Sequence, residues 1–256
     1  MSYPQIPLSH YLVVALLLVA AGCSSSTSTS TNNGQTTVTM QSQLTTSDVS
    51  RMATVKGATP SGVLFDSLVV TQALVFVKDV KLHSDVDDTT KDDHDATVKT
   101  GPFVIVFDSS GTHVVTTATI PSGTYDRVKF EIHKPDKNNT DDAAVLASYP
   151  QLQVGNQTYS VYIYGYTVRA GLRTAFMVHS SASRNGMFRF QDHDFTDRDN
   201  VQFVSNGSMT LNFQLDPRVI FHLLGGITGT VFDPNDATHQ NDIDNHVLVA
   251  IRILAY

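Results

Sequence analysis

The chain has 256 residues, a formal net charge of −7 and a single cysteine. This acidic balance argues against binding to nucleic-acid phosphates, which requires clustered Lys and Arg side chains. One cysteine cannot form an intramolecular disulfide, so the fold must be held together by burial of apolar side chains. The length suits one large or two small domains.

The N-terminal region contains an apolar run, YLVVALLLVA, at residues 11–20. The run is shorter than the roughly 20 residues that span a bilayer as a helix, and it has the length of a signal-peptide core. It leads into LVAAGC at residues 18–23, which resembles the lipobox of bacterial lipoproteins. The resemblance implies cleavage before Cys23 and acylation of its sulfur, for example with palmitate. We therefore predict a lipoprotein signal peptide over residues 1–22. The alternative is an ordinary secretory peptide, but the position of the lone cysteine favours a lipoprotein.

Residues 24–47 are rich in Ser and Thr and carry no charge. Such a segment has little apolar surface to offset the entropy of ordering it. We predict a flexible tether over residues 23–47 and a folded body over residues 48–256. Ser24, which follows the cysteine, resembles the sorting residue of outer-membrane lipoproteins. The expected location is thus the cell envelope, on the outer membrane where two membranes exist.

Apolar and polar residues alternate through most of the body, as in β-strands that have one buried face. In residues 124–134, Val128, Phe130 and Ile132 should point inward. Leu74, Phe76, Val80 and Leu82 are also at positions of one parity and should share a face. The expected strands lie within residues 62–83, 102–108, 113–120, 124–134, 158–168, 172–180, 187–191, 201–205 and 208–216.

Turn and helix signals complete the expected fold. Ala170-Gly171 predicts a hairpin, and Gly123 in a Pro-x-Gly turn is expected at positive φ. Residues 218–224 and 241–254 are helix candidates, although the second could equally be a strand. The pattern predicts a mainly β protein, an antiparallel β-sandwich or related antiparallel barrel with one or two short C-terminal helices.

Three segments carry a resemblance to a known family: residues 66–82 (DSLVVTQALVFVKDVKL), 101–108 (GPFVIVFD) and 120–132 (IPSGTYDRVKFEI). They resemble uncharacterised bacterial lipoproteins with a prealbumin-like or immunoglobulin-like β-sandwich domain. LDPRVIF at residues 215–221 and FDPND at residues 232–236 fit more loosely. The resemblance covers residues 62–256 and implies a fold and an envelope location, with no assigned activity.

Three acidic loops contain histidine, at residues 84–95, 191–200 and 232–246. Carboxylates suit Ca²⁺, and mixtures of Asp and His suit transition metals. None of the loops has EF-hand spacing, so we favour solvated surface loops and predict neither a tight metal site nor a cofactor. The metal-ligand candidates lie in the middle loop, which is flanked by strands: Asp192, His193, Asp194, Asp197 and Asp199.

Tyr162, Tyr164 and Tyr166 alternate along one predicted strand and should share a face. Exposed, they would form an aromatic strip able to stack on sugars or on a protein. The chain has no Trp, so we favour packing in the core or at its rim.

No catalytic signature is present: the sequence has no G-x-S-x-G, S-x-x-K, P-loop or H-E-x-x-H motif. We therefore expect a lipid-anchored envelope protein that is not an enzyme and that binds a protein or polysaccharide partner. The alternative is a metal-dependent enzyme or a calcium-stabilised module that uses the Asp/His loops.

Overall fold

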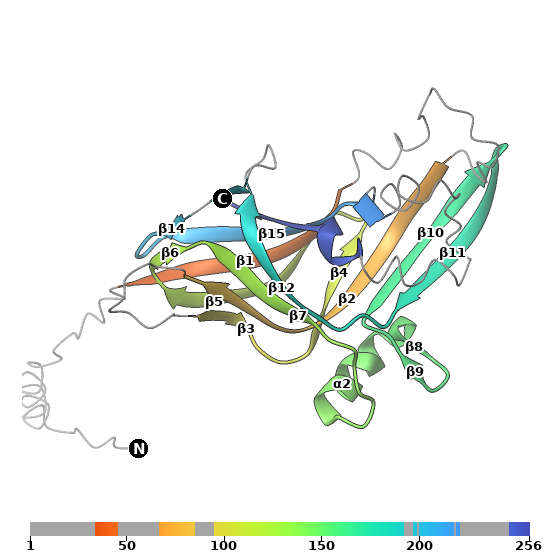
Figure 1. Ribbon diagram of the computed structural model, residues 1–256, viewed down its shortest axis with the longest axis horizontal. Helices are drawn as coiled ribbons and strands as arrows, with labels where there is room; N and C mark the ends of the chain where they lie inside the picture. The colour runs from red at the N-terminus through yellow and green to blue at the C-terminus, as the bar shows by residue number, and fades with distance from the viewer. Residues whose placement is uncertain are drawn as a thin grey trace, which may run out of the picture. The chain divides into compact units, whose positions relative to one another are not determined.

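The computed structural model describes residues 34–45, 67–84, 95–191, 197–198, 200–217, 219–220 and 246–256. These residues form a mainly β fold that includes one short α-helix, α2 (Thr140–Ser148) (Figure 1). None of the helices in these segments is both long enough and apolar enough to cross a membrane.

The strands follow one another closely along the chain, and most of the sequence-predicted strands are confirmed. Their bounds are β1 (Gln35–Leu44), β2 (Ser67–His83), β3 (Ala96–Lys99), β4 (Phe103–Asp108), β5 (Thr112–Pro121), β6 (Gly123–Tyr125), β7 (Arg127–Ile132), β8 (Gln153–Val154), β9 (Gln157–Thr158), β10 (Val161–Arg169), β11 (Leu172–Ser180), β12 (Arg184–Gln191), β13 (Asp197–Arg198), β14 (Val201–Phe203), β15 (Ser208–Leu215) and β16 (Ile251–Ala255).

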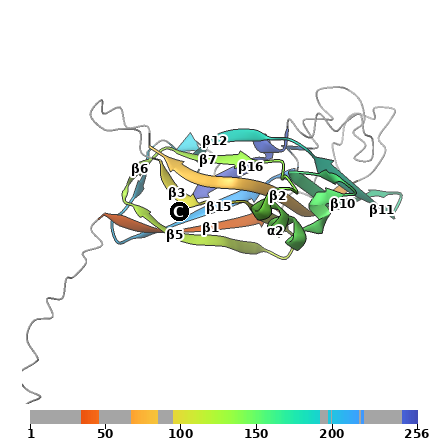
Figure 2. The same ribbon diagram turned by 90° about the horizontal axis from the view of Figure 1, so that it is seen from below.

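Twelve strands form one sheet with the order β11-β10-β2-β7-β12-β16-β15-β1-β5, with β3 and β4 on β2 and β13 on β12. The predicted antiparallel sandwich is therefore wrong in its details. The sheet is mixed, because β1 pairs with β15 in parallel. It is also continuous, because β12 pairs with β7 and, through Gln191 and Leu254, with β16. It curls like half a barrel, with β1 and β5 on one side and β2, β7 and β12 on the other (Figure 2).

The main hydrophobic core lies on the inner face of this curled sheet. The alternation predicted for β7 is confirmed, because Val128, Phe130 and Ile132 are buried there. A second, smaller cluster lies on the other face of β2 and β4, beneath α2 and the 3-10 helix η3 (Pro150–Leu152). Its members are Leu74, Phe76, Val104, Leu146, Leu152 and Tyr162.

The long strand β2 changes the face that it buries partway along its length. The pairing of β2 with β7 shifts between Val77 and Val80, and such an irregularity reverses the direction of later side chains. Leu74 and Phe76 consequently join the small cluster, whereas Val80 and Leu82 join the main core. The prediction that these four residues share a face is wrong, because it assumed an unbroken alternation.

The predicted tether contains a central strand. β1 lies between β15 and β5 and occupies ten residues of the segment expected to be flexible. Val38, Met40 and Leu44 are buried in the main core. The tether prediction is therefore wrong for residues 35–44, because tertiary pairing orders a segment that its composition alone would not.

The sequence also missed α2 and misjudged the C-terminal segment. Asn139 caps α2, since its side-chain oxygen accepts hydrogen bonds from the N–H groups of Asp141 and Asp142. At the C-terminus, residues 251–255 form the strand β16 rather than the favoured helix, because they complete the sheet beside β15. Of the other helix candidate, residues 219–220 are helical and residues 218 and 221–224 lie outside the description.

The two predicted turns have different outcomes. Ala170 and Gly171 join β10 to β11 with φ values of 47° and 80°, as a tight hairpin requires. Gly123 instead lies within β6 and is not among the described residues with positive φ. The prediction for Gly123 is wrong, because the chain pairs with β14 directly after Pro121 and needs no left-handed residue there.

Candidate functional site

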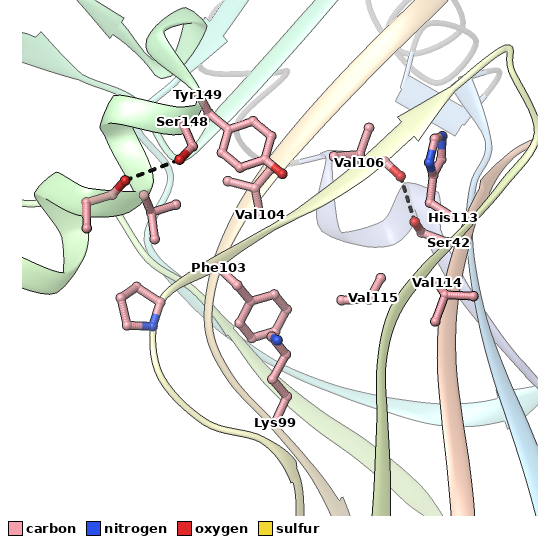
Figure 3. Close-up of a pocket in the computed structure, with 13 residues that line it drawn as sticks. Ser42, Lys99, Phe103, Val104, Val106, His113, Val114, Val115, Ser148 and Tyr149 are labelled. Carbon is pink, nitrogen blue, oxygen red and sulfur yellow. Dashed lines mark hydrogen bonds between the residues drawn. The ribbon is translucent and has the colours of Figure 1, made fainter.

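A groove of about 460 Å³ opens between α2, β4 and β5 (Figure 3). Its residues come from five elements and the segments beside them: β1, β3, β4, β5 and α2. They are Ser42, Lys99, Pro102, Phe103, Val104, Val106, His113, Val114, Val115, Ala144, Val145, Ser148 and Tyr149.

The groove exists because two consecutive strands part from each other. β4 and β5 are joined by a short turn and meet in one isolated bridge, between Asp108 and Gly111. Beyond that bridge β4 pairs with β2, whereas β5 pairs with β1. The Ser42 hydroxyl donates a 2.6 Å hydrogen bond to the Val106 carbonyl and ties the two parts of the sheet together at the base of the groove.

Eight of the thirteen residues that line the groove are apolar, and polar and apolar atoms share its exposed surface about equally. Val104 and Val106 project from β4 toward α2, where Val145 packs against the same small cluster. A bulge in β5 lets Val115 and its neighbour Val114 both line the opposite wall. Val114 is 67% exposed.

Two polar groups reach the groove without a hydrogen-bond or ion-pair partner among the described residues. Lys99 places its ammonium nitrogen 4.9 Å from the centre of the Phe103 ring, a cation–π contact. In the described part of the chain neither this nitrogen nor the Tyr149 hydroxyl has an ion-pair or hydrogen-bond partner. Figure 3 shows Lys99 beside Phe103 and His113 on another side of the groove. In the described part of the chain, the groove therefore combines valine side chains with a cation that has no ion-pair partner.

Asp108, Ser110 and His113 form a cluster at the turn between β4 and β5. Asp108 Oδ1 lies 2.6 Å from Ser110 Oγ and 2.9 Å from His113 Nε2. The same His113 nitrogen lies 3.3 Å from Ser110 Oγ. In a nucleophilic triad the carboxylate and the serine use different ring nitrogens, so that histidine can take the serine proton. Here one carboxylate oxygen binds both side chains, an arrangement that stabilises the turn. Sequence reasoning missed this cluster, although Asp-Ser-Ser-Gly is a typical turn sequence.

The turn cluster favours the ionised form of Asp108. Partial burial acts to raise the pKa of the Asp108 carboxyl, but hydrogen bonds from Ser110 and His113 and the charge of His113 outweigh it and lower that pKa. A depressed folded-state pKa stabilises the fold at pH values above the unfolded-state pKa. This contribution is lost as pH falls through the lower, folded-state pKa.

We therefore expect Asp108→Asn to destabilise the protein by about 1 kcal/mol at neutral pH. The difference from wild type should begin to shrink as pH falls below about 4, where the carboxyl of the unfolded chain becomes neutral, and should disappear below the lower folded-state pKa. Urea unfolding at pH 7 and pH 3 measures both values. A difference that is the same at the two pH values would contradict the assignment of charge to this turn.

Of the five metal-ligand candidates, the described residues include only Asp197. Asp197 is exposed on β13, and its Oδ1 accepts a 3.1 Å hydrogen bond from Gln191 Nε2. Asp192, His193, Asp194 and Asp199 lie outside the described residues. No group of three or more His, Cys, Asp or Glu side chains in the described segments could hold a metal ion.

The three alternating tyrosines on β10 differ in their surroundings. Tyr162 is buried, and its ring contacts His179 with 5.3 Å between centroids. Burial lowers the pKa of His179, although a hydrogen bond to the Gln151 carbonyl opposes this effect. The predicted packing is thus confirmed for Tyr162. Tyr164 is 38% exposed, and Tyr166 lies under the Arg173 guanidinium at 4.6 Å.

Comparison of the chain with protein-family models, curated proteins and solved structures finds no match.

Proposed function

We propose that this protein is a lipid-anchored lipoprotein of the cell envelope whose β body is a non-catalytic binding module. The observation that carries the anchor is the lipobox-like LVAAGC, which ends in the lone cysteine, Cys23. The observation that supports binding is the valine-lined groove between α2, β4 and β5, where the Lys99 ammonium group has no ion-pair partner among the described residues. Mostly apolar concave surfaces with a few polar groups are typical of ligand sites.

The side chains at the groove support binding rather than nucleophilic catalysis. The Ser110 hydroxyl lies 3.3 Å from His113 Nε2, but its oxygen lies closer to Asp108 Oδ1, at 2.6 Å. A serine that donates its proton to a carboxylate is held in the turn and is not activated for attack.

The start of β1 sets how far the body stands from the anchor. With Cys23 lipidated, the eleven residues 24–34 join the lipid to the first strand. Fully extended, such a segment spans at most about 40 Å. The body would therefore work close to the membrane surface, within reach of membrane components.

The anchor is tested by a substitution at the acylation site. Cys23→Ala should abolish incorporation of a clickable fatty acid in growing cells and leave an uncleaved precursor, since only a thiol supplies the acylated sulfur. Ser24→Ala is the matched control and should be labelled like wild type. Mass spectrometry of the purified protein reads both the label and the cleavage. Equal labelling of Cys23→Ala and wild type would overturn the proposal.

A further inference from the structure

We propose that the groove between α2, β4 and β5 binds a single-chain amphiphile with a carboxylate head, of the fatty-acid class, with the head at Lys99. This inference rests on the proposed binding function of the body and names its ligand. It does not depend on the lipid anchor at Cys23.

The size and lining of the groove suit a flexible hydrocarbon chain. Its volume of about 460 Å³ lies within the range of small-ligand sites, roughly 300–1,000 Å³. Valine side chains from three elements face the hollow: Val104 and Val106 on β4, Val114 on β5 and Val145 on α2. These valines offer dispersion contacts that an alkyl chain can use, while the polar side chains of the lining leave room for a polar head.

The charges at the groove favour a single orientation. The Lys99 ammonium is unpaired in the described residues and is held over the Phe103 ring, so a carboxylate can reach it without displacing a protein partner. The Tyr149 hydroxyl is a second donor in the lining. At the β4–β5 turn, Asp108 is kept ionised by its hydrogen bonds and would repel an anionic head. The carboxylate head of the ligand is therefore expected at Lys99, with its alkyl chain along the valine side chains.

The net charge of the protein favours a small ligand over an acidic macromolecule. With a formal charge of −7, the protein would repel an acidic protein surface or a polyanion over distances up to the Debye length, about 8 Å at physiological salt. A small monocarboxylate carries one charge and responds mainly to the nearest cation. Lys99 alone can neutralise it.

The test uses the full chain in native membrane vesicles and a photoactivatable, clickable decanoic acid, with the matching alcohol as the neutral probe. We expect the acid to cross-link to peptides from α2, β4 or β5, and to do so several-fold more efficiently than the alcohol. Lys99→Gln should lower labelling by the acid about five-fold, the size of a solvent-accessible ion pair, and leave labelling by the alcohol unchanged. Lys134→Gln, an exposed lysine outside the groove, should behave like wild type.

A second variant tests the groove independently of charge. Ala144 is an exposed helix residue on the groove wall, so Ala144→Trp should fill the hollow and reduce labelling by both probes without unfolding the protein. Equal labelling by the acid and the alcohol in wild type, or unchanged labelling in Ala144→Trp, would overturn the proposal. Loss of the groove ligand with normal acylation of Cys23 would leave the anchor intact, so the two failures are distinguishable.

Discussion

A protein that begins at residue 48 should fail to fold, whereas one that begins at residue 34 should fold and unfold cooperatively. The difference is β1, which lies between β15 and β5 and forms backbone hydrogen bonds with both strands. Val38, Met40 and Leu44 are each almost fully buried. At about 1.5–3 kcal/mol for each fully buried apolar side chain, their loss approaches the whole stability of a typical domain, about 5–15 kcal/mol.

Circular dichroism and urea unfolding of the two truncated proteins measure this effect. Single substitutions within β1 provide a matched pair in the protein that begins at residue 34. Met40→Asp places a charge in the core and should abolish the unfolding transition, while Thr37→Asp, at an exposed position on the other face, should be nearly neutral. Cooperative unfolding of the protein that begins at residue 48 would show that β1 is dispensable. It would then support the prediction of a flexible tether over residues 23–47.

Gly165→Ala should destabilise the protein by roughly 2–3 kcal/mol, as expected for overpacking a core position. A Cβ atom at residue 165 would collide with the backbone carbonyl of Val69 on β2 and would lie 2.8 Å from Cζ of Phe176 on β11. Phe176 is the cross-strand partner of Gly165, and its ring fills the space that a side chain would need. The Val69 carbonyl belongs to the β2–β10 pairing and cannot move without breaking it.

Gly123→Ala is the matched control, because Gly123 also lies in a strand but has open space where its Cβ would be. We expect a change within about 0.5 kcal/mol for this substitution, as at permissive surface positions. Chemical denaturation of both variants measures the contrast. Equal stability of the two variants would mean that β2, β10 and β11 are not packed as described.

Local sequence patterns identified most of the strands correctly. Alternation in β7 predicted both the strand and its buried face, because side chains on a pleated strand alternate strictly between faces. Ala170-Gly171 predicted its hairpin, because a two-residue turn requires positive φ and depends on few distant residues. The amino-acid sequence alone also carries the lipobox-like motif at Cys23, which is a linear signal.

The features that the sequence did not reveal depend on contacts between distant segments. In β1, Thr36 and Ser42 occupy inward positions and weaken the apolar pattern, but their hydroxyls bind the carbonyls of Val204 and Val106. Those partners lie 168 and 64 residues away along the chain. Local alternation cannot show that a distant strand will satisfy a buried hydroxyl.

The groove also depends on contacts between segments that are distant in the sequence. β4 and β5 read as two ordinary consecutive strands, and α2 has only two large apolar residues, Val145 and Leu146, which are too few to show helical periodicity. Pairing of β4 with β2 and of β5 with β1 separates the two strands, and Leu146 then docks α2 beside the opening. Strand identity follows from local periodicity, but the partner of each strand is chosen by burial and hydrogen bonding over the whole sheet. That choice placed Lys99 and the valines around one hollow.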